Sequence, residues 1–385
     1  MSLSVRRWSA IHRWSSVACT AFLLLLCVTG LPLVFHDEID AWLAPHHYAA
    51  MPADTPPVSL DTLAGTARQR YPHDVIASMQ LDDDEPQVVV WMVPSFAAMK
   101  ADFTVMHAVR FDSRSGALLQ ALPSRASETG TFTGLMLALH TSLMQGAMGE
   151  WFLGAMGLVF VLAVVSGVVL YAPFMKRLRF GTVRHDKAAR TRWLDLHNLL
   201  GICTVAWAVV VGLTGAMNEL STPLFQAWQQ HDVQPFLATH APPSDERGSV
   251  TASFQQALDS TRHAAPGMTI LSIAYPGNPF GSPYHYLAWM QGNEPLTSHL
   301  LTPALIDART GAVTATLRMP WYLRTLELAR PLHFGDYGGL AMKVVWAVLD
   351  GLTIVVLVSG LYLFVVKRRR RDAGNAAATV PGGVT

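Results

Sequence analysis

Four histidines stand at matched positions in two halves of the sequence, and histidine is the side chain that most often binds a metal. His12 and His197 are 185 positions apart (197 − 12), and each follows a tryptophan by four residues. His140 and His333 are 193 positions apart (333 − 140), and each follows a leucine. Two imidazoles that project from facing helices can supply both axial ligands of a haem iron. The pattern predicts two haems, one held by His12 and His197 and the other by His140 and His333.

The histidines belong to a longer internal repeat. Other pairs keep nearly the same offset: Thr29-Gly30 with Thr214-Gly215, Ser166-Gly167 with Ser359-Gly360, and Asp112–Gly116 with Asp307–Gly311. This offset indicates duplication of a unit made of a membrane-spanning segment (a span), a domain outside the membrane (an outer domain) and a second span. Each copy is expected to start and end on the same side of the membrane. The two copies are therefore parallel and related by an axis along the membrane normal. Span one is therefore expected to face span three, and span two to face span four, with matched residues at equal depth.

The composition requires membrane-spanning elements. The chain has 385 residues, of which 51% are hydrophobic and only 14% charged, which is too apolar for an ordinary soluble protein. Four stretches are long enough to cross a bilayer core, which takes ~20 apolar residues: Val17–Phe35, Trp151–Phe174, Leu199–Met217 and Val344–Val366. The expected fold class is an α-helical membrane protein, a four-helix bundle with two outer α+β domains.

Basic residues set the expected orientation. They gather before the first span, in the link between spans two and three, and after Lys367. Short basic flanks stay on the cytoplasmic side, so both termini are expected in the cytoplasm of a bacterium, with the protein in its inner membrane. The first span is expected to be retained rather than cleaved as a signal peptide, because it is the repeat partner of span three.

The predicted boundaries follow from the repeat and the spans. They are 1–36 for the first span, 37–132 for the first outer domain, 133–175 for the second span and 176–192 for the basic link. They continue with 193–218 for the third span, 219–329 for the second outer domain, 330–367 for the fourth span and 368–385 for a basic and then flexible tail. In each outer domain we expect a helix and then strands: Val58–Tyr71, Gln87–Val93 and Val105–Phe111 in the first, and Ser249–His263, Thr269–Tyr275 and Tyr284–Met290 in the second.

Two further residues break the repeat and are candidates for a secondary role. The position that matches His36 is Ser221, and His36 is an alternative ligand near the outer histidines. The position that matches Asp350 is Gly157. An acid inside a span is a candidate for proton handling, although a polar contact with a neighbouring helix explains it equally well.

Glycines after the outer histidines suggest room for a flat macrocycle close to the backbone. They are Gly146, Gly149, Gly335, Gly338 and Gly339.

Several motifs are missing from the sequence. It has no G-x-G-x-x-G after a strand and no Walker lysine loop, so we expect no nicotinamide, nucleotide or nucleic-acid partner. The cytoplasmic segments are too short for a flavin domain. A haem protein of this kind would receive its electrons from a membrane quinol or a separate cytoplasmic donor.

Five groups of residues together resemble the PepSY-associated transmembrane family of bacterial inner-membrane proteins, from about residue 5 to 370. They are Arg7-Trp8 with His12-Arg13-Trp14, Leu139-His140 with Gly146 and Gly149, Ser166-Gly167, Trp193 with Leu196-His197 and Gly201, and Leu332-His333-Phe334-Gly335. The two Asp-x-Arg-Ser/Thr-Gly turns resemble those of PepSY modules. Within this family the sequence looks most like the ferrioxamine-type siderophore reductases.

The resemblance implies two b-type haems ligated by His12, His197, His140 and His333, and reduction of Fe(III) carried by a siderophore in the periplasm. The leading hypothesis is therefore a ferric-siderophore reductase that passes electrons across the membrane. The alternative is a non-enzymatic, membrane-anchored PepSY module that docks a protein partner. A metal permease fits least well, because Asp350 is the one charged residue in the four apolar stretches.

Overall fold

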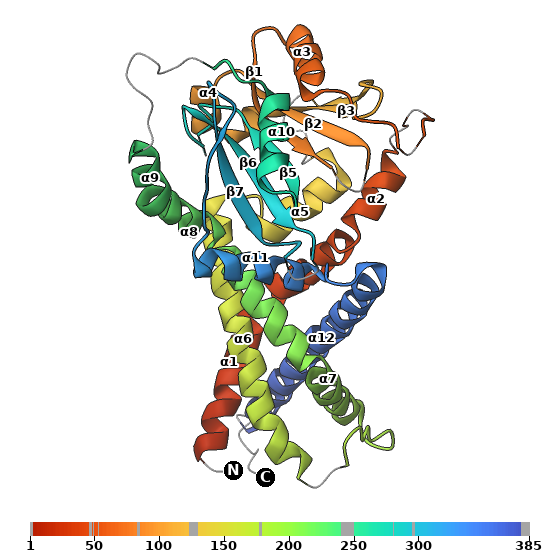
Figure 1. The fold of residues 1–385 in the computed structure, drawn as a ribbon. Coiled ribbons are helices and arrows are strands. Elements are labelled where there is room, and N and C mark those ends of the chain that lie inside the picture. Colours follow the sequence, from red (N-terminus) through yellow and green to blue (C-terminus); the bar gives the residue numbers. More distant parts are fainter. Residues whose placement is uncertain are drawn as a thin grey trace, which may run out of the picture. The chain divides into compact units, whose positions relative to one another are not determined.

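The structure is a computed structural model, and it describes residues 3–45, 48, 50–52, 54–82, 85–122, 130–176, 179–239, 250–279, 281–294 and 297–378 (Figure 1). The chain divides into two compact units. The bundle unit contains Met1–His36, Met136–Leu220 and Ala329–Thr385. The sheet unit contains Asp37–Leu135 and Ser221–Leu328. Each unit thus draws on both halves of the sequence, as a duplicated chain requires.

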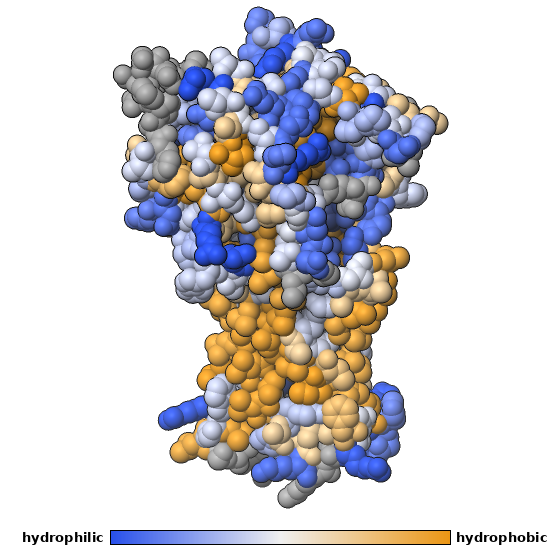
Figure 2. Space-filling model, in the orientation of Figure 1, coloured by the Kyte–Doolittle hydropathy of each residue, from blue (hydrophilic) through white to orange (hydrophobic). Residues whose placement is uncertain are grey.

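Four long helices make up most of the bundle unit, and each is long and apolar enough to cross a membrane. They are α1 (Leu3–Leu33), α6 (Ala147–Met175), α7 (Ala189–Asn218) and α12 (Gly339–Ala378). Figure 2 shows apolar side chains gathered over these helices. The four predicted spans are confirmed, and the chain is a multi-pass membrane protein.

The helix contacts match the expected symmetry. Helix α1 packs against α6 and α12, and helix α7 packs against the same two neighbours. Helix α1 therefore lies across the bundle from α7, and α6 lies across from α12, which agrees with the pairing that the duplication predicts.

The second and fourth spans differ from the predicted boundaries. The stretch expected as one span, 133–175, forms two helices, α5 (Phe132–Ser142) and α6. The fourth span is likewise preceded by a separate helix, α11 (Trp321–Phe334), and α12 continues to Ala378 through most of the expected flexible tail. Glycines allow these breaks: a Cβ on Gly149 would lie 1.7 Å from the Ser142 carbonyl oxygen. Gly335 has a φ of +79°. These two glycines thus shape the helix junctions.

The two outer domains form one eight-stranded antiparallel sheet rather than two separate sheets. The strand order is β4-β3-β2-β1-β5-β6-β7-β8. The strands of the first copy are β1 (Val75–Leu81), β2 (Gln87–Val93), β3 (His107–Asp112) and β4 (Leu118–Leu122). Those of the second copy are β5 (Met268–Ala274), β6 (His285–Gly292), β7 (Leu301–Asp307) and β8 (Val313–Thr316). Strands β1 and β5 pair, with Met79 opposite Ile273. This pairing removes the edge that each copy would otherwise expose.

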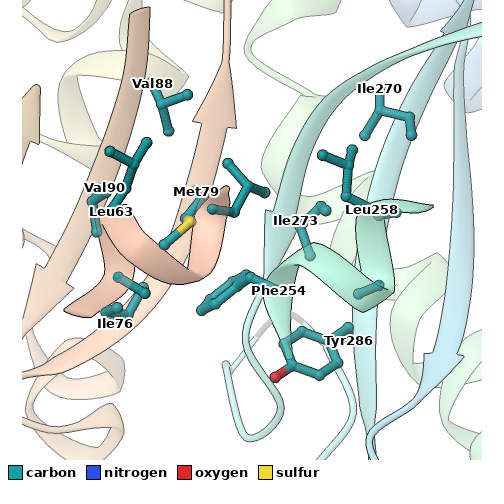
Figure 3. Close-up of a cluster of buried hydrophobic side chains, with 14 of the residues drawn as sticks. Leu63, Ile76, Met79, Val88, Val90, Phe254, Leu258, Ile270, Ile273 and Tyr286 are labelled. Atoms are coloured by element: carbon teal, nitrogen blue, oxygen red, sulfur yellow. The ribbon is translucent and has the colours of Figure 1, made fainter. Parts of the chain in front are cut away.

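Two helices cover one face of the sheet, α3 (Leu60–Arg70) and α10 (Phe254–Ala264). Serine side chains cap both: Ser59 accepts from the Asp61 N–H and Ser253 from the Gln256 N–H. Beneath them lies a continuous apolar core that crosses the junction between the copies (Figure 3). One core therefore stabilises both copies.

The opposite face of the sheet is covered differently in the two copies. In the second copy it lies under α8 (Ser221–Trp228), the π-helical turn Gln229–Val233 and α9 (Gln234–Thr239). In the first copy, α2 (His36–Leu43) holds the matching place in the sequence but buries none of its side chains. A short helix α4 (Phe96–Ala101), followed by the 3-10 turn Phe103–Val105, adds a small apolar cluster around Met99 and Val93.

Candidate functional site

The structure brings the four matched histidines together as two pairs. His12 from α1 faces His197 from α7, with ring centroids 6.3 Å apart and planes at 65°. His140 from α5 faces His333 from α11, with centroids 6.2 Å apart and planes at 61°. All four side chains are partly buried within the bundle unit. We call His12 and His197 the inner pair, and His140 and His333 the outer pair.

A neighbouring helix fixes one ring nitrogen of each inner histidine. The Nδ1 of His12 donates to the Ala163 carbonyl oxygen at 2.9 Å. The Nδ1 of His197 donates to the Val356 carbonyl oxygen at 3.0 Å. A carbonyl oxygen can only accept, so each Nδ1 carries the hydrogen and each Nε2 keeps a free lone pair. Hydroxyl oxygens support the same nitrogens, Ser166 at 3.3 Å and Ser359 at 3.0 Å.

The outer pair is fixed in the same way. The Nδ1 of His333 donates to the Val211 carbonyl oxygen at 3.1 Å and lies 3.2 Å from the Thr214 hydroxyl. The Nδ1 of His140 lies 3.1 Å from the Thr29 hydroxyl, which donates its own hydrogen to the Leu25 carbonyl oxygen at 2.8 Å. The Thr29 oxygen therefore accepts from His140, and the outer Nε2 atoms also keep their lone pairs.

A glycine beside each hydroxyl lets the ring approach the helix. A Cβ on Gly30 would lie 2.9 Å from His140 Cε1, and one on Gly215 would lie 3.0 Å from His333 Cε1. The inner rings lie almost as close: a Cβ on Gly167 or Gly360 would be 3.2 Å from the Cε1 of His12 or His197. Each histidine thus lies in a cradle made of a hydroxyl and a glycine on the next helix.

The ring separations suit a metal held between the two imidazoles of each pair. A histidine–metal bond measures about 2.0–2.1 Å, so two such bonds in line place the Nε2 atoms roughly 4 Å apart. The ring centres lie roughly 1 Å further back on each side, which gives a centroid separation of roughly 6 Å. The observed 6.3 Å and 6.2 Å agree with that arrangement. A hydrogen bond from the ring nitrogen that does not bind the metal, such as the one each Nδ1 makes here, orients a metal-binding histidine.

The two secondary candidates lie elsewhere. His36 is exposed at the start of α2, where its Nδ1 donates to the Leu33 carbonyl oxygen at 3.0 Å. Asp350 is buried in α12 with 8% of its surface exposed, and the Cys27 thiol hydrogen-bonds to its carboxyl group. Its Oδ2 has no hydrogen-bond partner in the described part of the chain. Of the two candidates, Asp350 thus has the polar contact to a neighbouring helix and His36 does not join the buried outer pair.

Sequence reasoning did not anticipate the cradles. Thr29-Gly30, Thr214-Gly215, Ser166-Gly167 and Ser359-Gly360 were visible only as landmarks of the repeat. Their shared hydroxyl-glycine pattern was the available signal, but which histidine each would contact depends on how the helices pack. The sequence reasoning also did not single out Lys343, a lysine of α12 with only 8% of its surface exposed.

The bundle unit also contains an ion pair between a partly exposed arginine and a buried aspartate, Arg184 and Asp195. Arg184 donates through Nη2 and Nε to the two carboxylate oxygens of Asp195, at 2.7 and 2.9 Å. Asp195 is 2% exposed and lies two residues before His197. This bidentate contact anchors the basic link to the helix that carries an inner histidine.

Fold and site together define a four-span membrane protein with two facing histidine pairs and an eight-stranded antiparallel sheet. The chain belongs to the family described as PepSY-associated TM region, whose model matches residues 9–367. It is also similar to a Pseudomonas aeruginosa protein, "Uncharacterized protein PA4219", with 29% identity over 263 residues. That match covers 63% of this chain and 65% of the relative, so the chain spans just under two thirds of the relative's length.

Proposed function

We propose that the protein is a haem-containing inner-membrane reductase that passes electrons across the membrane to a ferric siderophore in the periplasm. The observation that carries the proposal is the pair of facing imidazoles at each of two levels, with Nδ1 of every ring already bonded. A single histidine at a helix end needs no ligand. Four histidines that each lie beside a hydroxyl and a glycine of a neighbouring helix form a repeated set of potential metal ligands.

The residues present fit a b-type haem at each pair. His12 and His197 would hold one, and His140 and His333 the other, each through Nε2. Bound haem supplies reversible one-electron chemistry at iron. The protein's own contribution is to fix the tautomer and ring orientation through the cradles, and to exclude water by surrounding both pairs with apolar helices.

The spacing of the pairs supports transfer across the membrane. Along α7, His197 and the Thr214 that contacts His333 are 17 residues apart, which corresponds to about 26 Å of helix. A bilayer core is about 30 Å thick. This spacing supports the proposal that the two pairs lie near opposite faces of the membrane.

The proposed reaction transfers one electron to each Fe(III), giving Fe(II). Hydroxamate-type oxygen ligands are hard and hold Fe(II) less tightly than Fe(III), so reduction favours iron release. A membrane quinol would reduce two chelates and release two protons. A cytoplasmic donor protein is the other source that the sequence allows.

Haem content tests the proposal directly. Detergent-purified protein should contain two haems per chain by pyridine-haem absorbance, and His197→Ala and His333→Ala should each remove one. His263→Ala, at an exposed position on α10, is the matched control and should keep both. Reduced wild-type protein should then be reoxidised by a ferric siderophore. Purified protein without a Soret band would contradict the proposal. So would haem that stays reduced when ferric siderophore is added.

The alternative is a membrane-anchored PepSY module that docks a protein partner without redox chemistry. It gives the opposite result for the double variant His140→Ala/His333→Ala. A docking module would support iron uptake from the siderophore as well as the wild type does, whereas a reductase would lose that activity.

A further inference from the structure

The two copies present different surfaces on the sheet face opposite α3 and α10. In the first copy a row of paired residues crosses four strands: Gln80 pairs with Val89, Val89 with Arg110, and Arg110 with Gln120. Directly paired residues project to the same side of a sheet. Val88 and Val90 belong to the core under α3, so this row and the neighbouring Trp91 project to the other side. These residues, Gln80, Trp91, Arg110 and Gln120, are called the open face.

The matching surface of the second copy is apolar and sealed. Leu305, which corresponds to Arg110 at the offset of the Asp turns, pairs with Leu287 and is 1% exposed. Trp228, Val233 and Leu237 of the covering helices lie over it and are buried. A nearly closed cavity of about 10 Å³ remains there, too small for a ligand.

Among the described residues, the cover over the first copy is confined to α4 and the turn after it, which pack around Val93 and against one side of Trp91. Helix α2 buries none of its residues, and its Trp42 is 80% exposed, whereas the second copy's Trp228 is 4% exposed. Gln80 is exposed, and Trp91, Arg110 and Gln120 are partly exposed. The first copy therefore keeps a polar surface at the place where the second copy packs its own helices.

The open face contains side-chain hydrogen-bond donors that other described residues do not use. Arg110 forms no ion pair in the described part of the chain, and its buried Nε has no hydrogen-bond partner there. The Trp91 indole donates to the Gln80 carbonyl oxygen at 3.3 Å, which leaves the Gln80 amide N–H groups as donors. Two acids of the β1–β2 connection accept hydrogen bonds within the protein: Glu85 accepts from Tyr48 and from Gln87, and Asp82 accepts from Gln87.

We propose that the open face is the binding site for the ferric chelate. This inference rests on the proposed function. The guanidinium of Arg110 and the amides of Gln80 and Gln120 donate to chelate oxygens, and the Trp91 ring contacts its apolar backbone. Arginine's planar fork matches paired oxygen acceptors.

Gallium(III) chelates test the site apart from the redox chemistry. Gallium(III) matches the charge of iron(III) and is not reduced here, so binding is measured even in protein that lacks haem. The full-length protein in detergent is titrated by calorimetry with three gallium complexes: cationic desferrioxamine B, neutral ferrichrome-type trihydroxamate, and anionic citrate. We expect the wild-type protein to bind at least one of these complexes.

Two arginine variants make the test specific. Arg110→Leu installs the residue that the second copy has at this position, and it should weaken binding at least about tenfold, the range for a hydrogen-bonded charged group. Arg262→Leu makes the same charge change on α10, which covers the other face, and should change affinity less than about twofold. Gln120→Ala should weaken binding by a smaller factor, and thermal unfolding checks that each variant is folded.

The outcomes separate this inference from the proposed function. Unchanged affinity in Arg110→Leu, or an equal loss in Arg262→Leu, would overturn it. Absence of haem would overturn the proposed function and leave the gallium titration to be judged by itself.

Discussion

The two copies of the repeat agree closely in the bundle unit and diverge in the sheet unit. In the bundle, each histidine has the same bonded Nδ1 and the same close glycine in both copies. In the sheet unit, Trp42 and Trp228 stand at matching places near the ends of α2 and α8, yet one is 80% exposed and the other 4%. A ligand that needs an imidazole from each copy explains the first observation, because both copies must then keep the same geometry. The sheet has no such requirement, and its two halves specialise.

The largest expected effect is the difference in stability between variants of Trp228 and Trp42. Trp228→Ala should destabilise the sheet unit by about 3–5 kcal/mol, because it removes a large buried side chain from a packed cluster. Trp42→Ala should change stability by less than about 0.5 kcal/mol, because its ring is mostly exposed. Denaturant unfolding followed by circular dichroism measures both. Equal losses would mean that α2 also packs on a sheet, which would contradict an open face in the first copy.

A glycine substitution sharpens the agreement within the bundle. Gly30→Ala places a Cβ 2.9 Å from His140 Cε1, and displacing the ring should weaken the outer haem by about 1–3 kcal/mol, a typical cost of overpacking. Absorbance should show loss of one haem with the other retained. Gly351→Ala is the control in a span, because an added Cβ there meets nothing within 4 Å. Full haem content in Gly30→Ala would show that the cradle does not position His140.

The Asp turns give a smaller effect that depends on pH. Burial alone would raise the pKa of Asp307, but hydrogen bonds from Thr310 and from the Arg309 N–H outweigh it and hold that pKa below its ordinary value. A depressed carboxyl pKa contributes stability above the unfolded-state pKa, and that contribution is lost as the pH falls through the folded-state pKa. Asp307→Asn should therefore cost about 1 kcal/mol at pH 7, and its gap from the wild type should close below about pH 4.

The first copy supplies the matched variant for that measurement. Asp112 accepts from the backbone N–H groups of Arg114 and Ser115 and is completely buried. Asp112→Asn should cost at least as much at pH 7 as Asp307→Asn. Melting temperatures of both variants at pH 7 check this, and for Asp307→Asn a gap that widens between pH 8 and pH 3 would contradict the assigned pKa direction.

Much of this architecture could be predicted from the sequence, because long apolar runs and a steady repeat offset leave few alternatives. The helices α3 and α10 and strands β2 and β6 lie close to their predicted positions. Strand β1 and the β1–β5 pairing were not predicted, because Val75–Leu81 carries no strong turn signal and an edge pairing depends on tertiary contacts. His285 shows a limit for a single residue. It lies in the predicted strand Tyr284–Met290, but the prediction did not include its burial to 2% exposure or its contact with Ser282.

Asp350 gives the smallest expected effect and tests whether divergence in the bundle touches the histidine pairs. The matching residue of the first copy is Gly157, so symmetry does not require an acid at this depth. Asp350 bonds to Cys27 and to none of the four histidines among the described contacts. Asp350→Asn keeps the shape and an acceptor for the thiol. It should retain both haems and change stability by less than about 1 kcal/mol. Loss of either haem in this variant would make Asp350 part of the site, and the bundle would then be no more symmetric than the sheet.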